Sequence, residues 1–246
     1  MQNKGHQETL RITRFTFTDY HRGVPPHPSF FAMSEKTFLH QLIAEGEHQQ
    51  QDFKYKVTDA AKLAKSVSAF ANTGGGRLLI GVRDDGHVSG VRSEEEIYMM
   101  RSAAGDYCRP AADISFKTLL AEGRTVVIAT VEESGKKPIK ALCEDGKWKA
   151  YIRVADENIV ASPVHLHIWR DELSAQGQLI SIGDEETRVI QVLENSSPLT
   201  VGQVARRSGV NRHRVIVILA KLVRFGLADC HLDSQWLFTS PTPSCR

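Results

Sequence analysis

The chain has 246 residues, of which 41% are hydrophobic and 24% charged, so it holds enough apolar material for one large domain or for one medium and one small domain. Its net charge is only +2, which excludes a basic field over the whole molecule, so any contact with nucleic acid has to come from a local concentration of charge. The four cysteines stand far apart without a CxxC pair, which argues against a disulfide framework and a zinc site. No apolar run approaches the roughly 20 residues that span a bilayer. We therefore expect a cytoplasmic protein with no membrane partner.

Residues 1–33 form a predicted N-terminal extension. The segment TLRITRFTF, residues 9–17, is compatible with an edge strand, whereas the prolines of HRGVPPHPSF exclude a helix there. Met33 directly precedes Ser34, which is a good N-cap for the first helical pattern. Both Met1 and Met33 are therefore candidate starts of the protein.

Residues 34–172 are predicted to form an α+β domain, because helices mix with hairpin-linked strands instead of alternating regularly with single strands. Apolar residues at helical spacing indicate the helices, and short apolar or alternating runs indicate the strands. The expected elements are helices over 34–47, 59–72 and 93–108, strands over 49–57 and 77–82, a further strand after Asp85-Gly86, and two strand pairs around Glu122-Gly123 and Asp145-Gly146. In the first strand, Phe53 and Tyr55 would share one face, and Asp52 would lie on the opposite, polar face.

A polar, glycine-containing linker at 173–184 separates this domain from a predicted winged helix-turn-helix domain at 185–240, which leaves 241–246 as a tail. A glycine in a short turn between two helices is the helix-turn-helix pattern, and here the turn SGVN follows a short helix that Thr200 can cap. The expected elements are helices over 185–197, 199–210 and 211–226, followed by a two-stranded wing over 227–239.

Every charged side chain in the segment 199–225 is basic, in a protein that is otherwise nearly neutral. These side chains are Arg206, Arg207, Arg212, Arg214, Lys221 and Arg224. Arg212, His213 and Arg214 begin the second helix of the motif, which is the end that enters the major groove. We therefore expect Arg212 and Arg214 to contact base edges and the two arginines of the first helix to contact phosphates. The alternative is a winged helix that serves protein contacts or dimerisation.

The stretch FANTGGGRLLIGVRDDG, residues 70–86, has the glycines of a phosphate-binding loop. In such loops a strand leads into the glycines and a helix leaves them, so that helix N-terminal N–H groups face the phosphate. Here the helix comes first, and its C-terminal carbonyls, which repel phosphate, would lie beside the glycines. The sequence also lacks a GxxxxGK[ST] motif. It therefore predicts that the glycines end a helix and lead tightly into a buried strand.

The order of GEHQQQDFK, a helix, and SAFANTGGGRLLIGVRDDGHVSGV closely resembles the Schlafen AlbA-type domain, most strongly over residues 46–91. The resemblance extends to YIRVADENI, where Tyr151 and Arg153 match a Tyr/Arg strand common in the family. It implies a mixed-sheet α+β fold. In bacteria it also implies a DNA-binding domain that often precedes a C-terminal helix-turn-helix and sometimes carries an ATP-binding label.

RNA-cleaving members of the family hold a divalent metal with three carboxylates, and the resemblance places these at Glu47, Asp52 and Asp84. Three oxygen ligands suit Mg²⁺ or Mn²⁺, which would activate a water and neutralise charge on a phosphodiester. This chain departs from the pattern, because Asp52 stands where the family usually has Glu. Spacing alone puts Glu47 and Asp52 on opposite faces of a strand, so they converge only if the chain bends within HQQQ. The alternative places Glu47 at a solvated helix end, Asp52 on a strand surface and Asp84 in a turn.

Two further sets of side chains have binding chemistry. Basic residues around the same motifs are each explained by a solvated face, but together they would form a phosphate-contacting surface. They are Lys54, Lys56, Lys62, Lys65, Arg77 and Arg83. His165 and His167 would share one face if the segment VHLH is extended, but no third ligand has a matching spacing, so a metal site is not favoured there.

Two hypotheses for function follow. The favoured one is a non-enzymatic transcription regulator that binds DNA, in the form of a dimer because helix-turn-helix proteins usually read paired half-sites. The other is a Mg²⁺- or Mn²⁺-dependent RNA endonuclease that uses Glu47, Asp52 and Asp84, with the C-terminal domain as a targeting module.

Overall fold

The computed structural model describes residues 34–174, 181–196 and 198–241. The described residues fall into two compact units, which we call the first unit (34–162 with 169–174) and the second unit (163–168 with 181–241). The predicted N-terminal extension with its edge strand, and nearly all of the predicted tail, lie outside the described residues.

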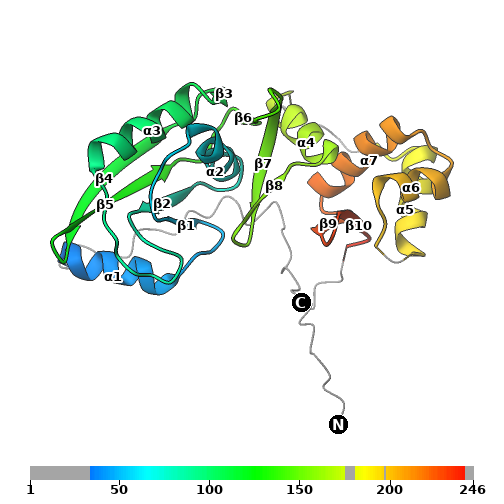
Figure 1. Ribbon diagram of the computed structural model, residues 1–246. Helices are drawn as coiled ribbons and strands as arrows, with labels where there is room; N and C mark the ends of the chain where they lie inside the picture. Colours follow the sequence, from blue (N-terminus) through cyan, green and yellow to red (C-terminus); the bar gives the residue numbers. More distant parts are fainter. Residues whose placement is uncertain (1–33, 175–180, 197, 242–246) are drawn as a thin grey trace, which may run out of the picture. The chain divides into compact units, whose positions relative to one another are not determined.

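The first unit contains two four-stranded sheets and three helices that pack on them (Figure 1). Its elements are α1 (Glu35–Glu45), β1 (Gln51–Lys54), α2 (Ala60–Asn72), β2 (Gly76–Ile80), α3 (Ser93–Gly105), β3 (Cys108–Arg109), β4 (Ile114–Ala121), β5 (Arg124–Val131), β6 (Lys140–Leu142), β7 (Trp148–Val154) and β8 (Glu157–Val160). The helix α4 (Pro163–Ser174) follows, and its two halves belong to different units.

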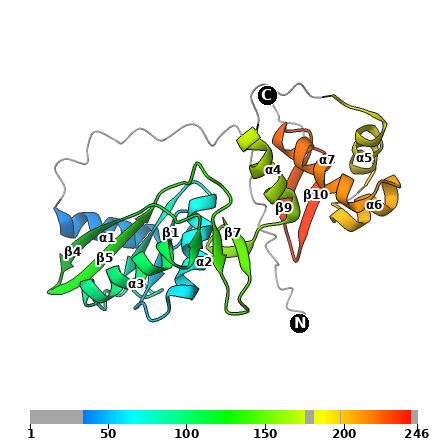
Figure 2. The same cartoon turned by 90° about the horizontal axis from the view of Figure 1, so that it is seen from above.

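The first sheet has the order β1-β2-β5-β4, in which β1 is parallel to β2 and the remaining pairs are antiparallel. Alternate residues of its strands enter two separate cores. Leu79 and Ile128 pack with α1, while Leu78 and Val127 face the core that α2 and α3 share. In Figure 2, α3 runs along β4 and β5. The mixed sheet confirms the predicted α+β class.

The second sheet is antiparallel, in the order β3-β6-β7-β8, and α2 packs against β6 and β7. One face of α2 therefore contacts this sheet while other residues of the helix join the core of the first sheet. Because α2 is buried on nearly all sides, its polar side chains reach solvent only in its first two turns.

Three expectations for this region were wrong in detail. The strand predicted over 49–57 is only β1, and the strand expected after Asp85-Gly86 is reduced to a single bridge between Val82 and Val88. The last predicted strand is divided in two, because Ala155 takes a positive φ of 53° and turns the chain into β8.

The glycines after α2 allow a tight turn from the helix into β2, as the helix-before-glycine order predicts. Gly75 has a φ of 73°, and a Cβ there would lie 2.9 Å from the carbonyl oxygen of Val131. A Cβ at Gly76 would lie 2.2 Å from the Phe70 ring. Only glycine lets the chain turn from the buried end of α2 into β2 at this distance.

Asn72, the last residue of α2, fastens that helix to the second sheet. Its side-chain amide donates to the carbonyl oxygens of Ile139 at 2.8 Å and Tyr151 at 2.9 Å. Its side-chain oxygen accepts from the backbone N–H of Ile139 at 2.8 Å. Thr73 continues the contact, since its hydroxyl accepts from the backbone N–H of Arg153. The segment FANT thus satisfies backbone groups that no strand partner reaches.

The second unit packs the first half of α4 with three further helices and a hairpin. Its other elements are α5 (Asp184–Glu194), α6 (Val201–Ser208), α7 (Arg212–Arg224), β9 (Asp229–Leu232) and β10 (Trp236–Thr239). Thr200 caps α6, as its hydroxyl accepts from the backbone N–H of Gln203, and Gly209 ends that helix in the left-handed conformation with a φ of 67°. Leu199 forms a bridge with Phe238 of β10. None of the described helices in either unit combines the length and hydrophobicity needed to cross a membrane.

We expect Asn72→Ala to lower the free energy of unfolding by about 2–4 kcal/mol, because it leaves buried backbone groups of β7 and of the segment before β6 without partners. Urea denaturation followed by circular dichroism measures the loss.

The matched control is Gln50→Ala. The Gln50 side chain is exposed and donates a single hydrogen bond to the carbonyl oxygen of Gly74 at 3.3 Å, so its loss should stay below about 1 kcal/mol. Equal losses in the two variants would contradict the role given to Asn72.

Candidate nucleic-acid interface

A buried ion pair between Asp52 and Arg153 lies at the centre of the first unit. Arg153 is 1% exposed, and its Nη2 lies 3.3 Å from Oδ1 of Asp52, which is itself 5% exposed. The guanidinium also donates to the side-chain oxygen of Asn158 and stacks on the Phe70 ring, with its Cζ 5.1 Å from the ring centroid. Asp52 therefore does not lie on a strand surface, because β7 brings a cation to the side of β1 that was expected to be polar and solvated.

Glu47 reaches the same cluster because the chain bends within HQQQ. Residue spacing alone could not decide whether this bend is present. Gly46 ends α1 with a φ of 70°, and His48 then bridges Gln51, so the chain reverses within HQQQ. The Glu47 carboxylate returns along the start of β1 and accepts from the backbone N–H of Phe53 at 2.9 Å. It also forms a side-chain hydrogen bond with Asp52.

The pKa values of the two carboxyl groups in the cluster shift in opposite directions. Burial raises the pKa of Glu47, and the hydrogen bond with Asp52 raises it further. Burial also acts to raise the pKa of Asp52, but the hydrogen bond with Glu47 and the charges of Lys54 and Arg153 outweigh it, so the pKa of Asp52 is lowered. Lys54 Nζ lies 2.7 Å from Oδ2 of Asp52. Of the two carboxyl groups, Glu47 therefore holds a proton more readily, and Asp52 is the one that faces two cations.

These residues do not fit a divalent metal. Both oxygens of Asp52 face cations, at 2.7 Å and 3.3 Å. Asp84 is exposed in the turn that follows β2 and does not join Glu47 and Asp52. Among the described residues, no group of three or more His, Cys, Asp or Glu side chains is arranged to hold a metal ion. The structure thus brings together two of the three carboxylates that the resemblance singled out and leaves the third apart.

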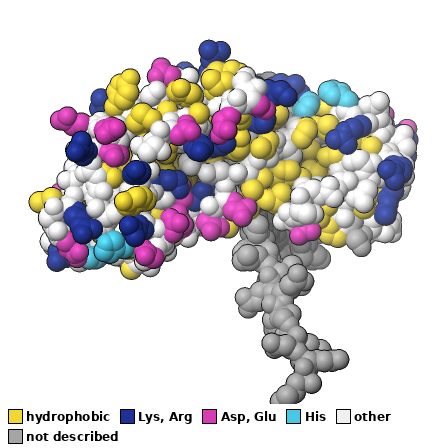
Figure 3. All heavy atoms as spheres, in the orientation of Figure 1, with side chains coloured by type: hydrophobic (Ala, Val, Ile, Leu, Met, Phe, Trp, Pro, Cys, Tyr) yellow, Lys and Arg dark blue, Asp and Glu magenta, His cyan; other side chains and the backbone are white. Residues whose placement is uncertain are grey.

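Some of the basic residues predicted to contact phosphate in the first unit already have partners within the chain. Lys54 pairs with Asp52, and Arg77 pairs with Glu45 and donates to the side-chain oxygen of Gln51 at 2.6 Å. Arg83 lies over the Tyr55 ring at 5.0 Å, and Lys56 is exposed. Figure 3 shows acidic and basic side chains interspersed over the visible face of this unit.

In the second unit, the arginines predicted to contact DNA differ in whether their side chains already have a partner within the chain. Arg214 is held by α5, with its Nε 2.7 Å from a Glu185 oxygen and its Nη2 3.6 Å from Glu186. Arg207 donates to the Ser196 hydroxyl at 2.8 Å. Arg206 and Arg212, by contrast, are exposed and have no ion pair within the described part of the chain.

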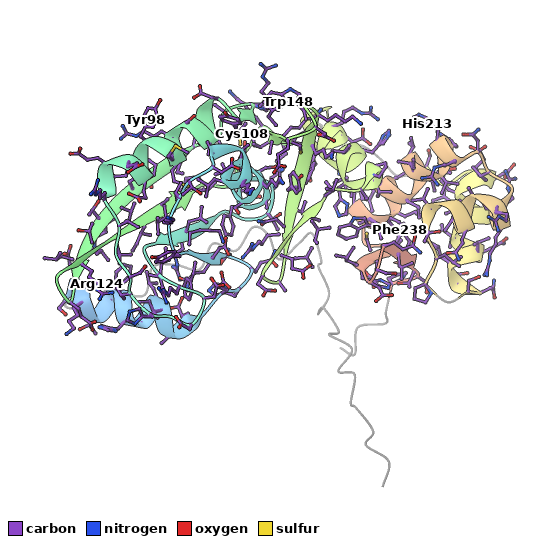
Figure 4. The ribbon with its side chains drawn as sticks, in the orientation of Figure 1. Tyr98, Cys108, Arg124, Trp148, His213 and Phe238 are labelled. Carbon is purple, nitrogen blue, oxygen red and sulfur yellow. The ribbon has the colours of Figure 1, made fainter. Side chains whose placement is uncertain are left out.

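The two histidines of VHLH lie on the helix α4 and not on an extended segment, so two residues apart they cannot share a face. The ring of His165 packs edge-on against Trp236, 4.6 Å between centroids, and that of His167 against His213 at 5.7 Å. Burial lowers the pKa of His165 to about 4, so this ring is neutral at physiological pH. Figure 4 labels His213 at the start of α7.

Arg153 is the residue whose role the sequence reasoning missed. It matched a family strand, but no partner was assigned to it. The signal was its position within YIRVA, where a charged side chain has the same parity as Tyr151 and so points to the core side of an otherwise apolar strand. Such a cation requires a buried anion, and Asp52 fills that need.

Comparison with known proteins places the first unit in a family. Residues 47–162 match the family model Schlafen, AlbA_2, so the chain carries a domain that belongs to this family. Membership points to nucleic-acid binding in general. No curated protein matches the chain.

Among solved structures, the chain is similar to the DIP2311 protein from Corynebacterium diphtheriae, with 17% identity and a TM-score of 0.43. That match covers 81% of this chain, but this chain spans only 37% of that protein.

The raised pKa of Glu47 predicts a pH-dependent effect of Glu47→Gln. Protonated Glu47 contributes its full stabilisation below 4.5, its ordinary pKa, and this contribution is lost as the pH rises through the raised pKa of the folded state. Asp52, whose pKa is lowered, loses its contribution only as the pH falls through its folded-state value, in both proteins alike. Glutamine can donate to Asp52 and accept from Phe53 without titrating. The variant should therefore gain stability relative to the wild type as the pH rises above 4.5 toward neutrality.

Thermal unfolding of both proteins across this pH range measures the difference. Glu47→Ala, which has neither hydrogen bond, should be less stable than the wild type throughout. A constant difference between the wild type and Glu47→Gln at every pH would show that Glu47 does not hold the proton.

Proposed function

We propose that the protein binds nucleic acid, and that its second unit is a winged helix-turn-helix through which it binds duplex DNA as a transcription regulator. The observation that carries the proposal is the start of α7. Arg212 follows the Asn211 cap directly, is exposed, and lies on a helix whose opposite face is buried. A guanidinium in this position has the geometry for bidentate contact with a guanine edge in the major groove.

The order of elements supports the same proposal. In the second unit, α5 precedes the bridging residue Leu199, the pair α6–α7 and the hairpin β9–β10, which is the order of a winged helix. Gly209 makes the turn between α6 and α7. Figure 3 shows Lys and Arg side chains on the visible face of this unit.

The contacts of the four arginines refine their proposed roles. Because α5 holds Arg214, we assign the base contact to Arg212 first, with Arg214 serving chiefly to fix the angle between α7 and α5. Arg206 is the better candidate for a phosphate contact than Arg207, which Ser196 already engages. We further propose a cytoplasmic homodimer, since two such helices would read paired half-sites.

We expect Arg212→Ala to weaken binding to a preferred duplex by about 1–3 kcal/mol and to relax sequence preference at one position, because a bidentate base contact is lost. Selection from a random duplex library identifies the preferred site, and fluorescence anisotropy on that site and on a scrambled duplex measures the change.

Arg224→Ala is the matched control, as Arg224 belongs to the last turn of the same helix and lies over Phe225. It should leave sequence preference unchanged. Equal binding of the wild type and Arg212→Ala to every duplex variant would refute the assignment.

A metal-dependent ribonuclease is the second candidate, because the bend after α1 does bring Glu47 and Asp52 together. The cations that neutralise Asp52 and the separate position of Asp84 argue against it. We therefore expect no Mn²⁺-dependent cleavage when the protein is incubated with tRNA.

Gel analysis of tRNA incubated with Mn²⁺ or with EDTA makes the test. Cleavage that needs Mn²⁺, disappears in Glu47→Ala and Asp84→Ala, and survives in Asp85→Ala would reverse the ranking. Asp85 is the suitable control because it is the exposed neighbour of Asp84 in the same turn.

A further inference from the structure

Several side chains on the outer face of the second sheet have not yet been assigned a role. Arg109 of β3 stands opposite Lys140 of β6, and Leu142 of β6 stands opposite Trp148 of β7. Opposed residues of antiparallel strands point to the same side, as do residues two apart on one strand. These four side chains therefore share one face, while Cys108 and its neighbours on the other face join the core with α2.

Arg109 reaches across β6 and covers the indole of Trp148. Its Cζ lies 4.5 Å from the ring centroid, which is stacking distance for a cation on an aromatic face. Arg109 is exposed and Trp148 is partly exposed, so the stack is open to solvent. Figure 4 labels Trp148 close to β3 and β6, at the edge of the unit.

The charge around this stack is positive because the nearby acids are already paired. In the turn between β6 and β7, Glu144 pairs with Lys65 and Asp145 pairs with Lys149. Two cations of this face, Arg109 and Lys140, have no ion pair within the described residues.

We propose that the Trp148 face, defined as Arg109, Lys140 and Trp148, binds single-stranded nucleic acid. An unpaired base would stack against the planar surface that the guanidinium and the indole provide, and Lys140 would contact a flanking phosphate. A duplex keeps its bases within its own stack, so it offers this face only phosphates. An acidic peptide would satisfy the cations and leave the planar surface unused. The site is distinct from α7 and adds a second nucleic-acid contact to the duplex binding proposed above.

The test uses the full chain and fluorescein-labelled single-stranded oligonucleotides of mixed sequence, one of RNA and one of DNA, with fluorescence anisotropy as the readout. Trp148→Leu keeps an apolar side chain but removes the stacking surface, and should weaken binding by about 5- to 150-fold. Trp148→Phe should restore most of the binding. The ratio of the RNA and DNA affinities identifies which strand the face takes.

Two controls separate stacking from simple charge attraction. An abasic oligonucleotide has the same phosphates without bases, so it should bind weakly to the wild type and equally weakly to Trp148→Leu. Arg101→Ala removes an arginine that stacks on Phe116 of the first sheet and should bind like the wild type.

Several results would overturn the proposal. These are failure of the wild type to bind single strands, unchanged binding in Trp148→Leu, or competition by polyglutamate as effective as that by the oligonucleotide. Failure of duplex binding through Arg212 would leave this result unaffected, because the two assays use different ligands and different variants. Loss of duplex and single-strand binding together in Trp148→Leu, with an unchanged melting temperature, would also contradict a site specific for unpaired bases.

Discussion

The first unit depends on the burial of one cation. Arg153 is nearly inaccessible to water, so its guanidinium needs anionic or carbonyl oxygens on the spot, and Asp52 and the carbonyl of Gln51 supply them from β1. This requirement brings the second sheet to the first. A buried pair of this kind adds little net stability, but removing one partner costs about 3–5 kcal/mol, so it enforces one arrangement of the strands. The side chains of Asn72 and Thr73 add hydrogen bonds from the end of α2 to backbone groups of β7.

The same pair limits the chemistry that the unit can perform. An aspartate whose two oxygens face Lys54 and Arg153 is no longer an open ligand for a divalent cation. Burial raises the pKa of its neighbour Glu47, which shares a hydrogen bond with Asp52. The carboxylates thus serve the fold, and the two surfaces that we propose for nucleic-acid binding lie elsewhere, at the exposed start of α7 and on the Trp148 face.

Local patterns predicted most of the elements well, because helix periodicity, caps and glycine turns act over a few residues. Ser34 and Thr200 cap the helices that were expected at those positions, and the hairpin at Glu122 joins β4 and β5. Patterns failed where a distant partner decides burial. Asp52 has the spacing of a surface residue, and only the approach of β7 buries it. The helix α4 was missed because its apolar residues form no amphipathic pattern strong enough to be distinguished from a strand.

The sequence by itself determined the α+β class, the Schlafen AlbA_2 resemblance of the first unit, and the role of the three glycines. The last followed from chain order alone, since a helix that precedes the glycines presents carbonyls and cannot cradle phosphate. Only the tertiary structure decided that Glu47 folds back to Asp52 while Asp84 remains apart, and that Arg109 covers Trp148. Each of these depends on segments far apart in the chain, and no local spacing encodes the distance between them.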